Sequence, residues 1–96
     1  SFSVRLINTN TANLYWNVGT EQNVKSYQVQ RSNNGVDFST INSVTATGNI
    51  AYQSDDKNLS NGKYYYRIQT LDKDGKYNYS SIVTVVIDKK KLKNLG

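Results

Sequence analysis

The chain has 96 residues and a net charge of +5, and it contains neither cysteine nor histidine. Disulfides are therefore excluded, and the commonest general base, thiol nucleophiles and the usual zinc ligands are missing. A chain of this length fits one domain that buries somewhat over ~60% of its unfolded-chain surface. No segment approaches the ~18 consecutive apolar residues of a membrane span, so we expect no membrane insertion.

The positive charge is concentrated near the C-terminus. Residues 1–87 carry eight Lys or Arg against six Asp or Glu, whereas residues 88–96 carry four Lys against one Asp. Such a tail could contact a nucleic acid or an anionic membrane, but a short charged stretch after a final strand is more typical of a solvated linker. We expect a domain at residues 1–87, a Lys-rich tail or linker at residues 88–96, and no nucleic-acid partner.

Alternating apolar and polar residues predict five strands in the first part of the chain. They cover residues 2–7, 11–18, 25–32, 38–44 and 50–54. The apolar residues of 38–44 recur at every third position, which is also compatible with a helix, but the Thr and Ser content favours an irregular strand. Trp16 lies in the middle of an apolar strand face, which favours a core position over a ligand platform.

Turn signals separate most of these strands. Asn34-Gly35 accepts the positive φ angles that tight hairpins require. Residues 55–58 are expected to form a loop that leads into Leu59, and this leucine is expected to fill one end of the core.

The longest β pattern covers residues 64–71 and 77–87, which we expect to pair through a turn at residues 72–75. Tyr64, Tyr66, Ile68 and Thr70 share the expected inward face of the first strand, and Tyr65, Arg67, Gln69 and Leu71 share its outward face. The return strand is expected to turn Tyr79, Ser81, Val83, Val85 and Ile87 inward. Its outward residues include Ile82 and Val86, which either lie under a second layer or form a small exposed patch.

About seven short strands and no convincing helix predict an all-β antiparallel sandwich. The expected structural core comprises Trp16, Tyr27, Val29, Leu59, Tyr64, Tyr66 and Ile68.

Three stretches of the sequence carry a family resemblance. They are Leu14-Tyr15-Trp16, Tyr27-Gln28-Val29-Gln30-Arg31 and Leu59-x-x-Gly62-x-Tyr64-x-Tyr66-x-Ile68. Together they resemble the fibronectin type III family over residues 2–87, which implies an immunoglobulin-like (fibronectin type III) sandwich. The resemblance also assigns Tyr64 to the family's tyrosine corner, with Leu59 beneath it. Family members usually carry prolines in their loops and this chain has none, so the loop conformations stay open.

A longer pattern is similar to modules near the C-termini of large secreted proteins of Bacteroidetes-type bacteria. It is met by Trp16, Glu21, Asn23, Tyr27, Val29, Arg31, Ser32, Gly35, Phe38, Tyr65, Tyr66, Arg67, Ile68, Asp72, Asp74, Gly75, Tyr79 and Ser80. Those modules typically precede a sorting domain read by the type nine secretion system, and they accompany polysaccharide hydrolases, proteases and adhesins. The resemblance implies an extracellular or cell-surface location and neighbouring domains of the same parent protein as partners.

Outward tyrosines are the candidate ligand-binding residues. Tyr15 and Tyr65 lie on predicted outward faces, and Tyr77 lies near the hairpin tip. Flat aromatic rings stack on sugars and are enriched at protein interfaces, but outward tyrosines also pair across strands and stabilise a sheet without any ligand.

No catalytic residue, metal site or cofactor is expected. Asp72-x-Asp74-Gly75 is interpreted as a turn, because the closing glutamate of a calcium loop is missing. Glu21 and the aspartates lie in predicted turns or loops and show no spacing typical of a glycosidase pair. The leading interpretation is a non-catalytic spacer or interaction module of a larger secreted or cell-surface bacterial protein, present as a monomer. The alternative is a carbohydrate-binding module, with a polysaccharide or another surface protein as partner.

Overall fold

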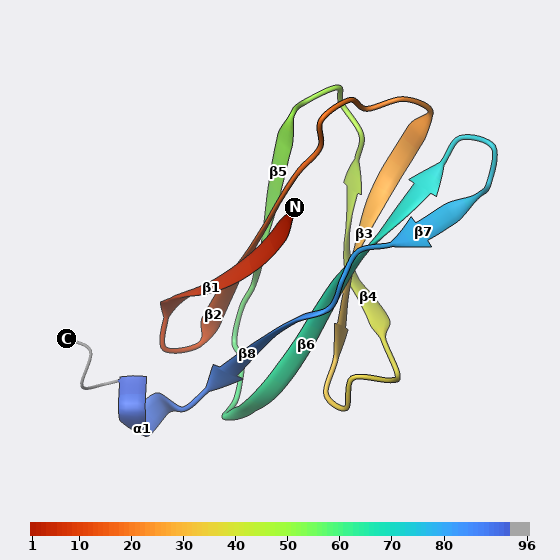
Figure 1. The fold of residues 1–96 in the computed structure, drawn as a ribbon. Coiled ribbons are helices and arrows are strands. Elements are labelled where there is room, and N and C mark those ends of the chain that lie inside the picture. Colours follow the sequence, from red (N-terminus) through yellow and green to blue (C-terminus); the bar gives the residue numbers. More distant parts are fainter. Residues whose placement is uncertain (93–96) are drawn as a thin grey trace.

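The computed structural model describes residues 1–92, which form eight strands and one short helix (Figure 1). The elements are β1 (Phe2–Asn8), β2 (Thr11–Asn17), β3 (Val24–Ser32), β4 (Ser39–Thr45), β5 (Ala51–Asp56), β6 (Gly62–Asp72), β7 (Tyr77–Tyr79), β8 (Val83–Ile87) and α1 (Lys89–Leu92). Residues 93–96 of the predicted tail lie outside the described part.

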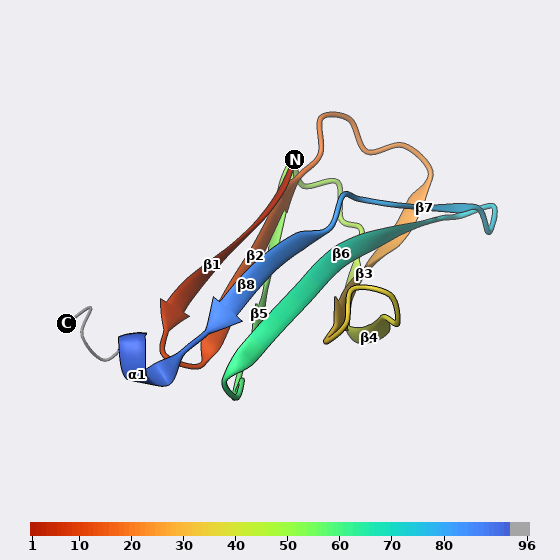
Figure 2. The same ribbon diagram turned by 60° about the horizontal axis from the view of Figure 1, so that its bottom comes forward.

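The strands form two antiparallel sheets that pack face to face (Figure 2). One sheet has the order β1-β2-β5, and the other has the order β4-β3-β6-β7, with β8 pairing to a further stretch of β6. The predicted all-β sandwich is therefore confirmed. The described residues contain eight strands where about seven were predicted, because the expected final strand is divided in two.

The prediction of one continuous strand over residues 77–87 is wrong. The backbone N–H of Ile68 donates to Ser80 Oγ, and the N–H of Ser80 donates to the Ile68 carbonyl, both at 2.8 Å. This bulge shifts the pairing by one residue between β7 and β8, which reverses the alternation of side chains. Tyr79 consequently lies on the outward face, not the predicted inward face, while Val83 beyond the bulge packs against the core.

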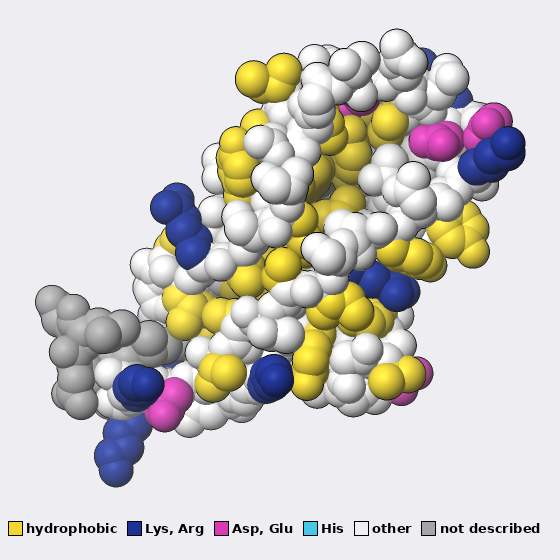
Figure 3. Space-filling model, viewed as in Figure 1, with side chains coloured by type: hydrophobic (Ala, Val, Ile, Leu, Met, Phe, Trp, Pro, Cys, Tyr) yellow, Lys and Arg dark blue, Asp and Glu magenta, His cyan; other side chains and the backbone are white. Residues whose placement is uncertain are grey.

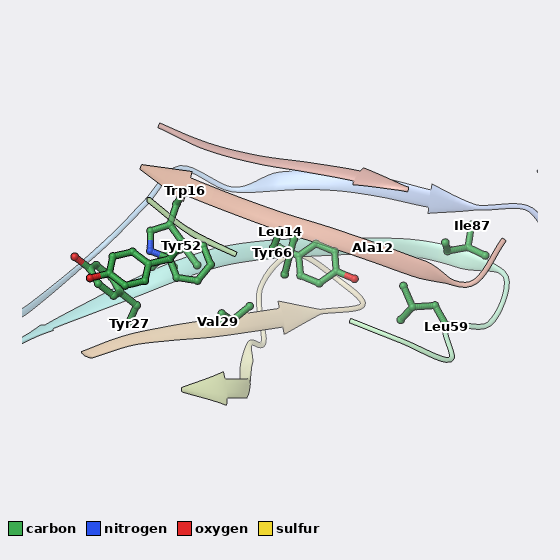
Figure 4. Packing of buried hydrophobic residues seen from close by; sticks show 10 residues of the cluster. Ala12, Leu14, Trp16, Tyr27, Val29, Tyr52, Leu59, Tyr66 and Ile87 are labelled. Atoms are coloured by element: carbon green, nitrogen blue, oxygen red, sulfur yellow. The ribbon is translucent and has the colours of Figure 1, made fainter. Parts of the chain in front are cut away.

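The core lies between the two sheets (Figure 4). Its buried members are Ala12, Leu14, Trp16, Tyr27, Val29, Tyr52, Leu59, Tyr66, Ile68 and Ile87. Trp16 stacks on Tyr52 with ring centroids 5.8 Å apart, and Tyr27 completes the aromatic group 4.9 Å from Tyr52. Aromatic contacts of this kind add about 0.5–1.5 kcal/mol each beyond the area they bury.

Tyr64 lies half-buried at the edge of this core, at the corner between β5 and β6. Its hydroxyl donates to the backbone carbonyl of Ser60 at 2.8 Å. A tyrosine hydroxyl bonded to the backbone a few residues upstream is the geometry of a tyrosine corner.

Asp56 joins the two sheets. The predicted loop over residues 55–58 is wrong at its start, because Asp55 and Asp56 continue strand β5. Asp56 is 7% exposed, and both of its oxygens accept from Arg31 Nη1 of the opposite sheet, at 2.9 and 3.0 Å. The buried Tyr66 hydroxyl also donates to Asp56 at 2.7 Å. Burial, followed by this hydrogen bond, raises the pKa of Tyr66 far above its usual range.

The single helical turn α1 was not predicted. It follows β8 directly, and the backbone N–H of Lys89 donates to Asn61 Oδ1 at 2.9 Å. Within residues 1–92, none of the helical structure is long and apolar enough to cross a membrane.

Candidate functional site

The outward face of the five-stranded sheet concentrates aromatic and basic side chains. Its positions on β6 are Lys63, Tyr65, Arg67, Gln69 and Leu71, and β7 adds Tyr77 and Tyr79 opposite Leu71 and Gln69. Its positions on β3 are Ser26, Gln28, Gln30 and Ser32. No Asp or Glu occupies an outward position on the described strands of this sheet.

Arg67 lies at the centre of this face. Its guanidinium carbon is 4.1 Å from the ring centroid of Phe38 and 3.9 Å from that of Tyr79. Phe38 comes from the β3–β4 connection on one side of β6, and Tyr79 comes from β7 on the other side. Nε donates to Gln30 Oε1 at 2.8 Å, and within residues 1–92 neither Nη atom donates a hydrogen bond. The result is a planar cation held between two rings, with its outer donors available.

The three tyrosines predicted from the sequence do not form one site. Tyr15 is 42% exposed on the outward face of the three-stranded sheet, on the other side of the molecule. Tyr77 is 58% exposed and packs edge-on against Tyr79, with ring centroids 5.6 Å apart. Tyr65 and Tyr77 share a face of the sheet. However, Tyr77 lies opposite Leu71, and Leu71 is about 20 Å from Tyr65 along β6 at the usual rise per strand residue.

Tyr65 is also less accessible than the other two. It is half-buried, and Lys63 Nζ lies 5.1 Å from its ring centroid. Gly35 has a φ of +79°, and a Cβ there would come within 3.2 Å of the Tyr65 ring. The Asn34-Gly35 turn therefore packs against Tyr65, which leaves less of its ring free to stack on a ligand.

Glu21 holds together the loops at one end of the sandwich. Its carboxylate accepts from the hydroxyls of Tyr27 and Tyr52, at 2.7 and 2.6 Å, and from the Gly48 N–H at 2.6 Å. Desolvation raises the pKa of Glu21, but these hydrogen bonds and the positive charge of Lys73 lower it more, so that the net pKa lies below the usual 4.5. The arrangement stabilises the ionised carboxylate.

Glu21→Gln is expected to lower the free energy of unfolding by about 1–2 kcal/mol at pH 7, because charge-assisted hydrogen bonds to two core tyrosines are weakened. The folded-state pKa is depressed, so this stabilisation is present above the unfolded-state pKa and is lost as the pH falls through the folded-state pKa. Urea denaturation of both proteins between pH 7 and pH 3 should therefore show their difference shrinking in acid. A difference that stays constant with pH would contradict the assignment.

Comparison with solved structures identifies the fold. No protein-family model and no curated protein matches the sequence. The structure is similar to the sixth fibronectin type III domain of human fibronectin type III domain-containing protein 3, with a TM-score of 0.70 over 90% of this chain and 79% of that domain. The chain has a fibronectin type III fold. The two sequences are 23% identical, so the likeness establishes the fold alone.

A groove opens between the two sheets of this fibronectin type III fold, beside the start of β1. It encloses about 310 Å³ and is lined by Ser1, Phe2, Trp16, Asn17, Val18, Tyr27, Ile68, Thr70, Asn78, Tyr79, Ser80 and Ser81. Hydrophobic side chains are visible along the seam between the sheets in Figure 3. No carboxylate lines this groove, and residues 1–92 contain no group of three or more side chains suited to hold a metal ion.

Sequence reasoning missed the residues around Arg67. The alternation placed Arg67 outward, but Phe38 was interpreted as the start of a strand and Tyr79 as inward, and the family-like pattern that contains all three did not show that they meet. The bulge at Ser80 decides the position of Tyr79, and a serine in an otherwise regular β pattern gives no clear signal of it. The available signal was the arginine itself, since a cation at the centre of an aromatic-rich strand favours ring contacts.

Proposed function

We propose that this fibronectin type III fold acts as a non-catalytic spacer or interaction module within a larger secreted or cell-surface bacterial protein. The observation that carries the proposal is the position of the two ends. The Ser1 amino group donates to Asn17 Oδ1 at the end of β2, whereas Lys89 binds Asn61 at the opposite end of the sandwich (Figure 1). The molecule measures 46 × 26 × 18 Å, so segments joined at its ends would be separated along its long dimension.

The chain has two parts with different roles. Residues 1–87 form the folded module, and residues 88–96 serve as the connection to a neighbouring domain, which is the primary partner. The resemblance to modules of secreted bacterial proteins supports the extracellular or cell-surface location and the type nine secretion context. We propose a monomer that binds no cofactor and no nucleic acid and does not insert into a membrane.

A fusion of two spectroscopic reporter domains to the ends of the chain tests the spacer role. A flexible Gly/Ser linker of equal length has a root-mean-square span of about 55 Å, close to the long dimension of the module, so the mean separation does not discriminate. The width of the distribution of reporter separations distinguishes a rigid module from a flexible linker. A rigid module should give a distribution much narrower than that of the matched flexible linker. Equal widths would contradict the spacer role.

The alternative function is a carbohydrate-binding module. It is supported by the exposed rings of Tyr15 and Tyr77, and less by the half-buried Tyr65. An amide chemical-shift titration against a panel of soluble polysaccharide fragments tests it. Saturable shifts around any of these tyrosines that are lost on substitution to alanine, without unfolding, would favour the alternative. Absence of shifts at millimolar ligand would exclude it for that panel.

A further inference from the structure

We propose that the outward face of the five-stranded sheet binds an acidic oligosaccharide, a chain of uronate sugars, through Arg67. The inference rests on the carbohydrate-binding alternative and names its site and its ligand class. It is independent of the spacer role, which requires no ligand.

The Arg67 guanidinium is preorganised to bind a carboxylate. The rings of Phe38 and Tyr79 hold the guanidinium from both sides, and Gln30 fixes its Nε atom. A guanidinium presents a planar fork of donors that matches the two oxygens of a carboxylate. Because the side chain is already ordered by these contacts, little conformational entropy is lost when the ligand binds.

The charge of this face favours an anion. Lys63 lies on the same outward row of β6, four residues from Arg67, and the outward positions on the described strands of this five-stranded sheet include no Asp or Glu. Two carboxylates of the neighbouring turns keep their charge but are hydrogen-bonded within their own turns: Asp37 accepts from Asn34 Nδ2, and Asp74 accepts from the Lys76 N–H. Two cations on one row suit a ligand with repeated negative charges.

The position of the site favours a sugar over a peptide. Arg67 lies in the middle of the sheet, where the backbone groups of β6 pair with β3 and with β7 and β8. An extended acidic peptide therefore cannot add as a strand at this point and must be recognised by side chains alone. Further along the same face lie the partly exposed amides of Gln28 and Gln69 and the exposed ring of Tyr77, which suit hydroxyl groups and the flat face of a sugar.

Amide chemical-shift titration of the full 96-residue chain with hexagalacturonate tests the inference, and the fully methyl-esterified hexamer provides the matched neutral ligand. We expect saturable shifts confined to β3, β6 and β7, and at least about tenfold weaker binding of the ester. Arg67→Gln should weaken binding of the acid by about tenfold or more. Arg67→Lys keeps the charge and the aliphatic stem but loses the fork, and should weaken binding by a smaller factor.

Arg5→Gln is the control, because it removes the same charge from the exposed outward face of the other sheet. It should leave the affinity within about twofold. Equal losses in Arg5→Gln and Arg67→Gln, equal binding of acid and ester, equally tight binding of a poly-glutamate peptide, or no saturable shift at millimolar hexagalacturonate would each overturn the inference. Binding of sugars at Tyr15 with no hexagalacturonate binding at the Arg67 face would overturn it while preserving the carbohydrate-binding alternative.

Discussion

Asp56→Ala is expected to destabilise the domain by about 3 kcal/mol, because removing one partner of a buried ion pair leaves the other uncompensated. The substitution removes both contacts to Arg31 and leaves the hydroxyl of the fully buried Tyr66 without its acceptor. The Arg31 side chain is 33% exposed and stays partly hydrated. The expected loss of unfolding free energy therefore lies near the lower end of the range for breaking a buried ion pair. The melting temperature should fall by roughly 15 °C.

Asp55→Ala provides the matched control. Asp55 is adjacent on β5 but exposed, and within residues 1–92 its carboxylate accepts one hydrogen bond, from Asn13 Nδ2 at 2.8 Å. We expect a loss of less than about 1 kcal/mol in urea denaturation, as for most exposed positions. If Asp56→Ala costs no more than Asp55→Ala, the contact between the sheets does not stabilise the fold as argued.

Trp16→Ala is expected to cost about 4 kcal/mol, since it removes a 3% exposed ring from the middle of the core. The stacking on Tyr52 and the contact with Tyr27, both at 5.8 Å, are lost with it. A loss of this size is a large part of the ~5–15 kcal/mol that stabilises a typical domain. Urea denaturation followed by far-ultraviolet circular dichroism measures it without relying on tryptophan fluorescence.

Two further variants make this prediction specific. Trp16 Nε1 is buried and has no hydrogen-bond partner within residues 1–92, so Trp16→Phe sacrifices no hydrogen bond and should cost only about 1–2 kcal/mol. Tyr15→Ala, at the adjacent exposed position, should cost less than about 1 kcal/mol. A Trp16→Phe loss as large as that of Trp16→Ala would show that the indole N–H has a role that the packing does not explain.

The fold was predictable because burial on one face of each sheet imposes a period of two. Trp16, Val29, Tyr66 and Ile68 all follow that period, and each is buried. The alternation failed where one extra residue entered the ladder at Ser80, since a bulge changes the pairing without changing the composition of the strand. It also failed at Asp56, because the groups that stabilise this buried carboxylate within residues 1–92, Arg31 and Tyr66, are distant from it in the sequence.

The candidate site was less predictable than the fold. The sequence indicated the outward positions of Tyr15, Tyr65 and Tyr77, but not that Tyr15 would lie on the opposite sheet. The contact between Phe38, Arg67 and Tyr79 requires the order of the strands and the register of β7, and neither follows from local patterns. Residues that meet through side-chain contacts between two strands and a connecting loop therefore emerged only from the structure.

The spacer role is tested most directly by following the two-reporter fusion through a urea series. We predict a narrow distribution of reporter separations that persists without broadening up to the cooperative unfolding transition of the domain. Above that transition the distribution should become as wide as that of the matched flexible linker. A distribution that is already wide in the absence of urea, while circular dichroism shows the domain folded, would contradict the role proposed for this chain.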